Sequence, residues 1–311
     1  MDFPDDDATL AFGPSAVRAA ARVILAGGIV AVPTETVYGL AADATDAQAV
    51  ARIYAAKGRP SFNPLIVHVP DLAAARAIAD FDADALALAQ AFWPGPLTLV
   101  RPLRLGTAIA GLVTAGLDTV AIRVPRHRAM QALLAESGRP LAAPSANASG
   151  GISPTRSQHV RASLGPAIPI LDDGATEAGL ESTIVAGRII LRPGPVTAAM
   201  LADVLGTVEQ GPETPALVTA PGQLASHYAP RKALRLNATE AAADEWLIGF
   251  GAVAGHDTLS ASGDPVEAAA RLFDALHRAD ASDHARLAIA PIPADGIGAA
   301  INDRLRRAAT R

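Results

Sequence analysis

Short apolar runs alternate with segments of helical spacing along this chain, and this alternation limits its fold more than any other feature of the sequence. Strands are predicted at residues 29–32, 65–69, 97–100, 119–124, 168–171, 182–185 and 189–191. Helices are predicted at residues 15–26, 46–56, 84–92, 127–137 and 197–205. Strands interleaved with helices favour the α/β class.

The pattern breaks near residue 211. Four prolines occur between residues 211 and 230, and no helical or strand period is visible there. This is typical of a linker. About 80 residues follow with their own α/β pattern, which includes helices at 264–279 and at the end of the chain. The sequence therefore predicts domains at 1–210 and 232–311, joined by a linker at 211–231.

Composition and motifs exclude several classes of protein. The chain has no cysteine, so disulfides, zinc ribbons and thiol nucleophiles are absent. Its net charge of −5 does not suit general nucleic-acid binding. The longest apolar run, at 23–32, is too short to span a bilayer, and the acidic N-terminus does not resemble a signal peptide, so a cytoplasmic protein is expected. The glycines at 249–255 nearly match a dinucleotide fingerprint, but a turn after a strand explains them better.

Polar residues cluster at the ends of predicted strands, where α/β sheets bind ligands. Segment 33–40 contains Thr36, and a polar ligand site and a capped helix start explain it equally well. Segment 57–64 contains Lys57, Arg59 and Asn63, and it favours phosphate binding over a solvated basic helix end. His68 by itself is typical of a core histidine with satisfied hydrogen bonds.

Two further segments carry candidate residues. On the strand 119–124, Thr119 and Arg123 share one face. A buried arginine needs an anion, and either the protein or a ligand carboxylate could supply it. Segment 143–151 is rich in small residues around Ser145 and Asn147, which could approach a ligand, although a flexible surface loop is its default interpretation. Ser153 followed by a proline predicts the N-cap of a helix that ends near residue 164.

Taken together, these segments resemble the YrdC-like family in its long, two-domain form. The resemblance rests on Pro-Thr-Glu-Thr-Val-Tyr-Gly-Leu at 33–40, Lys-Gly-Arg-Pro at 57–60, Ala-Ile-Arg-Val-Pro at 121–125 and Pro-Ser-Ala-Asn at 144–147. Later blocks at 181–185 and 191–194 also fit, as do Pro-Gly at 221–222 and His-Tyr-Ala-Pro at 227–230. The chain departs from the family between those last two blocks, where its linker lacks the usual basic residues.

The resemblance implies a twisted mixed β-sheet with flanking helices and a concave active-site face, followed by a smaller Rossmann-like domain. It implies a nucleotidyltransferase that converts L-threonine, bicarbonate and ATP into L-threonylcarbamoyl-AMP and pyrophosphate. The product would pass to a tRNA threonylcarbamoyl transferase complex, which modifies the adenosine beside the anticodon, and a weak tRNA contact is expected. Mg²⁺ would be held mainly by the ATP phosphates, so no metal ligand is assigned.

The family's functional residues transfer to this chain by position. Its threonine-binding residues fall on Thr36, His68, Arg123 and Ala143, the last through its main chain. Its ATP-binding residues fall on Arg59, Asn63, Thr119, Ser145, Asn147, Ser153, Arg192 and Tyr228. Lys57 and Arg59 would be catalytic through positioning and charge neutralisation, with no covalent nucleophile. The linker would cover the site and exclude water from a labile carbamate.

A different class of function remains as an alternative, because some YrdC-like domains are described as RNA-binding modules without catalysis. The net charge and the aromatic content of 4% count against it. Carbamoyl transfer, as in hydrogenase-maturation proteins with this domain, is a second alternative. It is disfavoured because those proteins carry zinc-finger segments and this chain has no cysteine.

Overall fold

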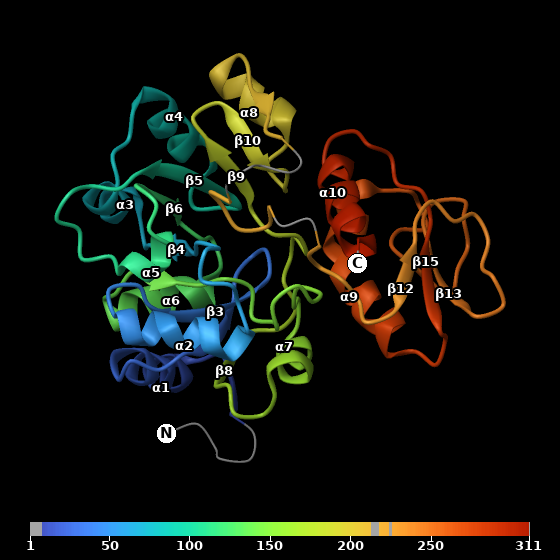
Figure 1. Ribbon diagram of the computed structural model, residues 1–311, viewed down its shortest axis with the longest axis horizontal. Coiled ribbons are helices and arrows are strands. Elements are labelled where there is room, and N and C mark those ends of the chain that lie inside the picture. The colour runs from blue at the N-terminus through green and yellow to red at the C-terminus, as the bar shows by residue number, and fades with distance from the viewer. Residues whose placement is uncertain (1–7, 213–217, 224–225, 311) are drawn as a thin grey trace.

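A computed structural model describes residues 8–212, 218–223 and 226–310. Within these residues, eleven strands form one mixed sheet in the order β1-β8-β2-β3-β7-β4-β6-β5-β9-β10-β11. Four more strands form a separate parallel sheet in the order β12-β15-β13-β14 (Figure 1). The predicted α/β architecture, with a twisted mixed sheet and a smaller Rossmann-like unit, is confirmed. No helix in the described residues is both long and apolar enough to cross a membrane.

The large sheet is built from short strands: β1 (Thr9–Ala11), β2 (Val30–Pro33), β3 (Tyr38–Asp43), β4 (Ile66–His68), β5 (Leu97–Pro102), β6 (Thr119–Arg123), β7 (Leu141–Ala142), β8 (Ile170–Asp172), β9 (Thr183–Ala186), β10 (Ile189–Arg192) and β11 (Glu209–Gln210). Its helices are α1 (Pro14–Leu25), α2 (Ala47–Lys57), α3 (Leu72–Ile78), α4 (Ala83–Phe92), α5 (Gly111–Thr114), α6 (Arg128–Ser137), α7 (Ser157–Leu164) and α8 (Ala198–Leu205). The C-terminal unit contains β12 (Ala233–Arg235), β13 (Glu245–Gly249), β14 (Asp257–Thr258), α9 (Pro265–Ala281), β15 (Arg286–Ile289) and α10 (Gly298–Ala309).

Local capping explains where several helices begin and end. The Asp46 carboxylate accepts hydrogen bonds from the first amides of α2, and Gly58 ends that helix in the left-handed conformation. Asp264 caps α9 in the same way. These two boundaries agree with the predicted ones. The helix predicted to begin at Ser153 is an error, because α7 starts only at Ser157 and the Ser153 hydroxyl bonds Glu181 instead.

Two central strands are absent from the predicted ones, β3 and the two-residue strand β7. Residues 38–43 form β3, which pairs antiparallel with β2, so the polar residues 34–36 occupy a hairpin turn rather than a helix start. The Thr34 hydroxyl closes this turn by donating to the Val37 carbonyl over 2.8 Å. Every residue of β3 is buried, so the strand has no alternation of polar and apolar side chains to reveal it.

Apolar clusters cover both faces of the large sheet. Helices α1 and α6 pack against the face that carries Val30 and Val32, while α2 packs against the face that carries Ala31. Because neighbouring residues of a strand point to opposite faces, these clusters define a three-layer arrangement. Helices α4 and α8 cover the β5–β9 end of the sheet.

The C-terminal unit is docked against the large sheet through an apolar cluster. Helices α9 and α10 lie between the small sheet and the large unit (Figure 1). The cluster joins them to Val37, Ile152 and Leu180 of the large unit. Gly179 adopts a φ of +64°, and a Cβ at this residue would lie 2.3 Å from the carbonyl oxygen of Ala270 in α9. Backbone therefore approaches backbone closely at this contact.

The predicted domain limits stay a prediction. Strand β11, which ends at Gln210, still pairs with β10 of the large sheet, and β12 of the small sheet begins at Ala233. Residues 213–217 and 224–225 of the predicted linker lie outside the described residues, as does the acidic segment 1–7.

Candidate active site

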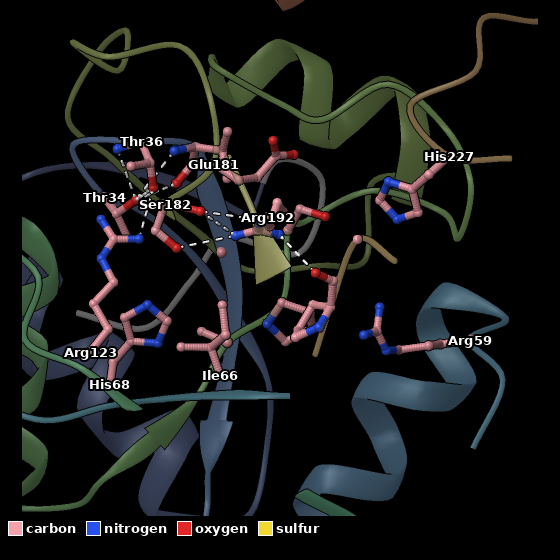
Figure 2. Close-up of a pocket in the computed structure, with 17 residues that line it drawn as sticks. Thr34, Thr36, Arg59, Ile66, His68, Arg123, Glu181, Ser182, Arg192 and His227 are labelled. Atoms are coloured by element: carbon pink, nitrogen blue, oxygen red, sulfur yellow. Dashed lines mark hydrogen bonds between the residues drawn. The ribbon is translucent and has the colours of Figure 1, made fainter. Parts of the chain in front are cut away.

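A pocket lined by several charged and hydroxyl-bearing side chains forms where the β2–β3 hairpin, the ends of β4 and β6, and residues 143–145 meet. Glu181, Ser182 and Arg192 form another part of its wall, together with linker residues 221, 222 and 227. Figure 2 shows Arg123 and His68 on one side of this pocket and Arg59 and His227 on the other. The pocket thus combines residues from segments more than 100 positions apart in the sequence.

The hairpin turn places two threonines in the pocket. The Thr34 and Thr36 hydroxyls are 2.7 Å apart, and the amide of Thr36 donates to the Thr34 hydroxyl over 3.1 Å. Nη1 of Arg123 donates to the Thr36 hydroxyl over 2.9 Å. These bonds hold the Thr36 oxygen at a defined position in the pocket wall.

Arg123 already has an anionic partner inside the protein. Its Nη2 lies 2.7 Å from Oε1 of Glu35, and both side chains are almost fully buried. Burial tends to raise the pKa of Glu35, but the Arg123 guanidinium outweighs it and the pKa of this carboxyl falls below its usual value. The backbone amide of Arg126 donates to the other Glu35 oxygen. The sequence left open whether the protein or a ligand carboxylate neutralises Arg123, and in the structure the protein supplies an anion, Glu35.

His68 stands beside Arg123, because β4 and β6 are parallel and pair these two residues directly. Burial, followed by the charge of Arg123, lowers the pKa of His68 to about 3. The imidazole is therefore neutral at physiological pH. Its Nδ1 atom is buried and has no hydrogen-bond partner among the described residues, although the side chain lines the pocket. A polar group of a ligand would satisfy this nitrogen, as acceptor or donor according to the tautomer of the imidazole.

Lys57 supports the pocket from behind. Its ammonium donates to the carbonyl oxygens of Ser145, over 2.6 Å, and of Asn147. Lys57 does not line the pocket. Burial and, after it, the charge of Arg59 lower the pKa of Lys57 well below its ordinary value. The contacts fix the loop that places Ser145 in the pocket wall.

Arg59 and Arg192 also line the pocket, apart from Arg123. Arg59 donates to the carbonyls of Asn63 and Pro64, which leaves its guanidinium in the pocket wall. Burial lowers the pKa of Arg59 to about 10, so it stays charged at neutral pH. Arg192 donates from Nε and Nη2 to the Ser182 carbonyl over 3.1 and 2.9 Å. It also contacts the linker carbonyl of Pro221 at 3.4 Å.

The linker contributes His227 and Tyr228. His227 lines the pocket, and its buried Nδ1 has no partner among the described residues. Burial and the nearby cations, Arg59 first, lower its pKa well below the usual value. The Tyr228 ring packs edge-on against His227 at 4.0 Å, is fully buried, and has an unpartnered hydroxyl in the described structure. Two aromatic side chains from the linker therefore close this side of the site.

The pocket brings together seven of the predicted site residues: Thr36, Arg59, His68, Arg123, Ala143, Ser145 and Arg192. Six others do not line it: Lys57, Asn63, Thr119, Asn147, Ser153 and Tyr228. Thr119 is at the opposite end of β6 from Arg123. Asn147 donates to the carbonyls of Ala148 and Gly151 and so fastens its own loop. The roles assigned to all thirteen residues stay predictions.

Among the polar side chains of the pocket, Glu181, Ser182 and His227 had no role predicted from the sequence, whereas Thr34 lies in segment 33–40, which was a candidate polar ligand site. The blocks at 181–185 and 227–230 are the sequence signal for these three residues. Their chemistry depends on partners far along the chain. Ser182, for example, lies 2.7 Å from the Thr98 hydroxyl, and the two residues are 84 positions apart.

The charges of the lining define what the pocket can bind. Among the described lining residues, Arg59, Arg123 and Arg192 carry positive charge and Glu181 carries negative charge, while His68 and His227 are neutral. A basic, largely buried pocket suits a small anionic ligand with phosphate or carboxylate groups. The fold and the site thus define an α/β protein that binds such a ligand near the ends of its strands.

Comparison with known proteins identifies the family. The model described as Telomere recombination, which covers Sua5, YciO and YrdC, matches residues 22–194. The model described as Threonylcarbamoyl-AMP synthase, C-terminal domain, matches residues 196–310. The chain belongs to the threonylcarbamoyl-AMP synthase family in its long, two-domain form.

Full-length relatives and a solved structure agree with this assignment. The threonylcarbamoyl-AMP synthase of Pyrococcus abyssi is 38% identical over 320 residues, which cover 94% of this chain and 93% of the relative. The enzyme of the same name from Bacillus subtilis is also 38% identical, and the match covers 94% and 92%. The crystal structure of P. abyssi Sua5 complexed with L-threonine superposes with a TM-score of 0.89 at 35% identity, covering 97% and 96%. Relatives named as synthases do not favour a non-catalytic RNA-binding role.

Proposed function

We propose that this protein is a nucleotidyltransferase that makes L-threonylcarbamoyl-AMP and pyrophosphate from L-threonine, bicarbonate and ATP, for the threonylcarbamoylation of tRNA. The observation that carries this proposal is the similarity, over nearly the whole chain, to P. abyssi Sua5, whose structure contains L-threonine. The charge of the pocket supports it, because both threonine and ATP carry anionic groups.

Threonine would bind at the end of the pocket formed by β4, β6 and the hairpin. The Arg123 guanidinium would contact the carboxylate, and its ion pair with Glu35 keeps the group charged and fixed. The Thr36 hydroxyl, the unpartnered His68 Nδ1 and the main chain of Ala143 would supply hydrogen bonds. The amine of threonine would then lie inside the pocket.

ATP would bind toward the side of Arg59 and Arg192, where Ser145 and His227 also line the pocket. Arg59 would neutralise charge on the phosphates in the transition state. Lys57 would act with it, held by the loop carbonyls that it contacts. Further nucleotide contacts are assigned to Asn63, Thr119, Asn147, Ser153, Arg192 and Tyr228.

The reaction needs no covalent protein intermediate. The threonine amine forms a bond to the carbon of bicarbonate and water leaves, which gives a carbamate. A carbamate oxygen then attacks the α-phosphorus of ATP, and pyrophosphate leaves with the electrons of the broken bond. The described residues contain no group of three or more histidine, aspartate or glutamate side chains suited to a metal, so Mg²⁺ would arrive on the ATP phosphates.

We also propose roles for the linker and a destination for the product. Residues 1–210 would be the catalytic domain, residues 211–231 the linker over the site and residues 232–311 the smaller domain. The linker residues His227 and Tyr228 would exclude water while the carbamate exists. The product would pass to a tRNA threonylcarbamoyl transferase complex, with at most a weak contact between this chain and tRNA.

Pyrophosphate release from ATP tests the proposal directly. Release that requires both L-threonine and bicarbonate is the expected result. ATP and threonine that bind without release would indicate a missing partner or an unproductive linker arrangement. If neither substrate binds, the enzymatic proposal is wrong, and salt-dependent RNA binding becomes the hypothesis to test.

A further inference from the structure

An arginine of the C-terminal unit reaches the wall of the active site. Arg304 lies on α10 and is fully buried, on the same face as the apolar residues Ile301 and Leu305. Its Nε donates to Oε2 of Glu181 over 2.9 Å, across the contact between the two units. A buried arginine on an apolar helix face is unfavourable unless an anion is placed to receive it.

Among the described residues, Glu181 is the carboxylate that lines the pocket, and Figure 2 shows it near Ser182 and Arg192. Its second oxygen accepts a hydrogen bond from the Ser153 hydroxyl. A carboxylate at this position would repel the phosphates of a nucleotide if its charge were not compensated. Arg304 supplies the compensating charge from behind the pocket wall.

The same guanidinium also supports the linker. It lies 5.2 Å from the centre of the Tyr228 ring, in the geometry of a cation–π contact. Nη1 of Arg304 donates to Asp303 over 2.6 Å, which leaves Nη2 buried without a hydrogen-bond partner among the described residues. One side chain of the C-terminal unit thus contacts both Glu181 of the pocket wall and the linker.

Docking of the two units does not depend on Arg304 alone. The apolar cluster of α9 with Val37, Ile152 and Leu180 holds them together, and Arg156 on the large unit pairs with Asp274 on α9 at 3.0 Å. If Arg304 served only to join the two units, it would not need to pair with a carboxylate that lines the active site.

We propose that Arg304 is a positioning residue of the nucleotide site, which neutralises and orients Glu181 so that ATP can bind beside it. The inference rests on the proposed function, and it gives the C-terminal unit a specific task in that function. Arg304 acts through Glu181 and does not line the pocket itself. Its loss should therefore affect ATP far more than threonine.

The test compares Arg304→Met, the double variant Glu181→Gln/Arg304→Met, and Arg307→Met as a matched control. Arg307 lies one turn further along α10 and shares Asp303 as a partner, at 3.0 Å, but the contacts of Glu181 do not include it. Binding of ATP and of L-threonine is measured separately by calorimetry on the full chain, and a thermal melt reports folding.

Arg304→Met is expected to weaken ATP binding on the order of tenfold or more, because Glu181 beside the phosphates loses the arginine that is hydrogen-bonded to it. Threonine binding should change by less than about threefold. The double variant removes both charges and should recover most of the lost ATP affinity, as expected for two coupled groups. Arg307→Met should bind both substrates like the unmodified protein.

Three results would overturn the inference: an unchanged ATP affinity in Arg304→Met, equal losses for ATP and threonine, or no recovery in the double variant. If Arg304→Met does not fold, Arg304→Lys keeps the charge without the planar fork. It should then show a smaller loss, of about threefold, confined to ATP. ATP binding is measured without turnover. The role of Arg304 can therefore be tested even if the protein releases no pyrophosphate and the proposed reaction is wrong. A protein that binds no ATP would refute both proposals.

Discussion

Lys57→Met separates two roles for this lysine, support of a loop and direct contact with phosphate. The Lys57 ammonium donates to two main-chain carbonyls, of Ser145 and Asn147, in a buried environment. Methionine has a similar length but no donor. Each buried carbonyl left without a partner destabilises the folded state by about 1–3 kcal/mol. Removing a buried charge offsets part of this.

Two such carbonyls would cost about 2–6 kcal/mol, and after the offset from the removed charge the expected loss of stability in Lys57→Met is about 3 kcal/mol. For a protein of this size, such a loss lowers the melting temperature by roughly 5 °C. The loop at 145–147 should shift when its anchor is lost, so ATP affinity should fall together with stability. Calorimetric melting of the unliganded protein and ATP titration measure the two effects independently.

The other lysine of the chain, Lys232, provides the control. Its ammonium also donates to a main-chain carbonyl, that of Ser282, but it is only partly buried and lies in the C-terminal unit. Lys232→Met should lower the melting temperature only slightly and leave ATP binding unchanged. Loss of ATP affinity in Lys57→Met with an unchanged melting temperature would refute the support role and favour direct contact with phosphate.

Three further predictions follow from contacts in the structure. Arg123→Ala should weaken use of L-threonine far more than binding of ATP, and equal losses in substrate titrations would contradict the carboxylate role. Burial, and then the neighbouring His159, lowers the pKa of His277 to about 4 in the folded protein. As the pH falls, the imidazole is therefore protonated in the unfolded chain before it is protonated in the folded one. The free energy of unfolding should therefore decline from about pH 6.5 toward pH 4, by about 3 kcal/mol in total. Urea unfolding of His277→Gln should show a flatter pH dependence over this range, and an unchanged dependence would contradict the assignment. Gly179→Ala should be several-fold more destabilising than Gly187→Ala in thermal melts. Both residues have positive φ, but only a Cβ at Gly179 would meet the backbone of α9. Similar losses for the two variants would show that α9 shifts to accommodate the methyl group.

Local chemistry made much of the fold predictable. Asp46 and Asp264 mark helix starts because a side-chain oxygen can satisfy the first free amides wherever such a helix occurs. The positions of most strands and helices follow from the spacing of apolar residues, which depends only on near neighbours in sequence. Strand β3 was missed because it is buried on both faces and carries no alternating pattern.

The candidate site was predictable only in part, and again for a physical reason. The sequence by itself determined that Arg59, His68, Arg123 and Ser145 stand at the ends of strands or in neighbouring loops, where they can meet. Spacing could not reveal which anion neutralises a buried cation, because that partner is chosen by tertiary contact. The pairing of Arg123 with Glu35 joins residues 88 positions apart (123 − 35), and Arg304 meets Glu181 across 123 positions.

Tertiary structure likewise decided that Ser153, predicted as a helix cap, donates to a carboxylate of the pocket wall. From the sequence alone, a serine hydroxyl is equally suited to cap a helix and to donate to a distant carboxylate. The fold of the large unit brings Ser153 within hydrogen-bond distance of Glu181, and the packing of α10 against that unit brings Arg304 to the same carboxylate. The residue types of the site were thus determined by the sequence, and the charge partners of those residues by the fold.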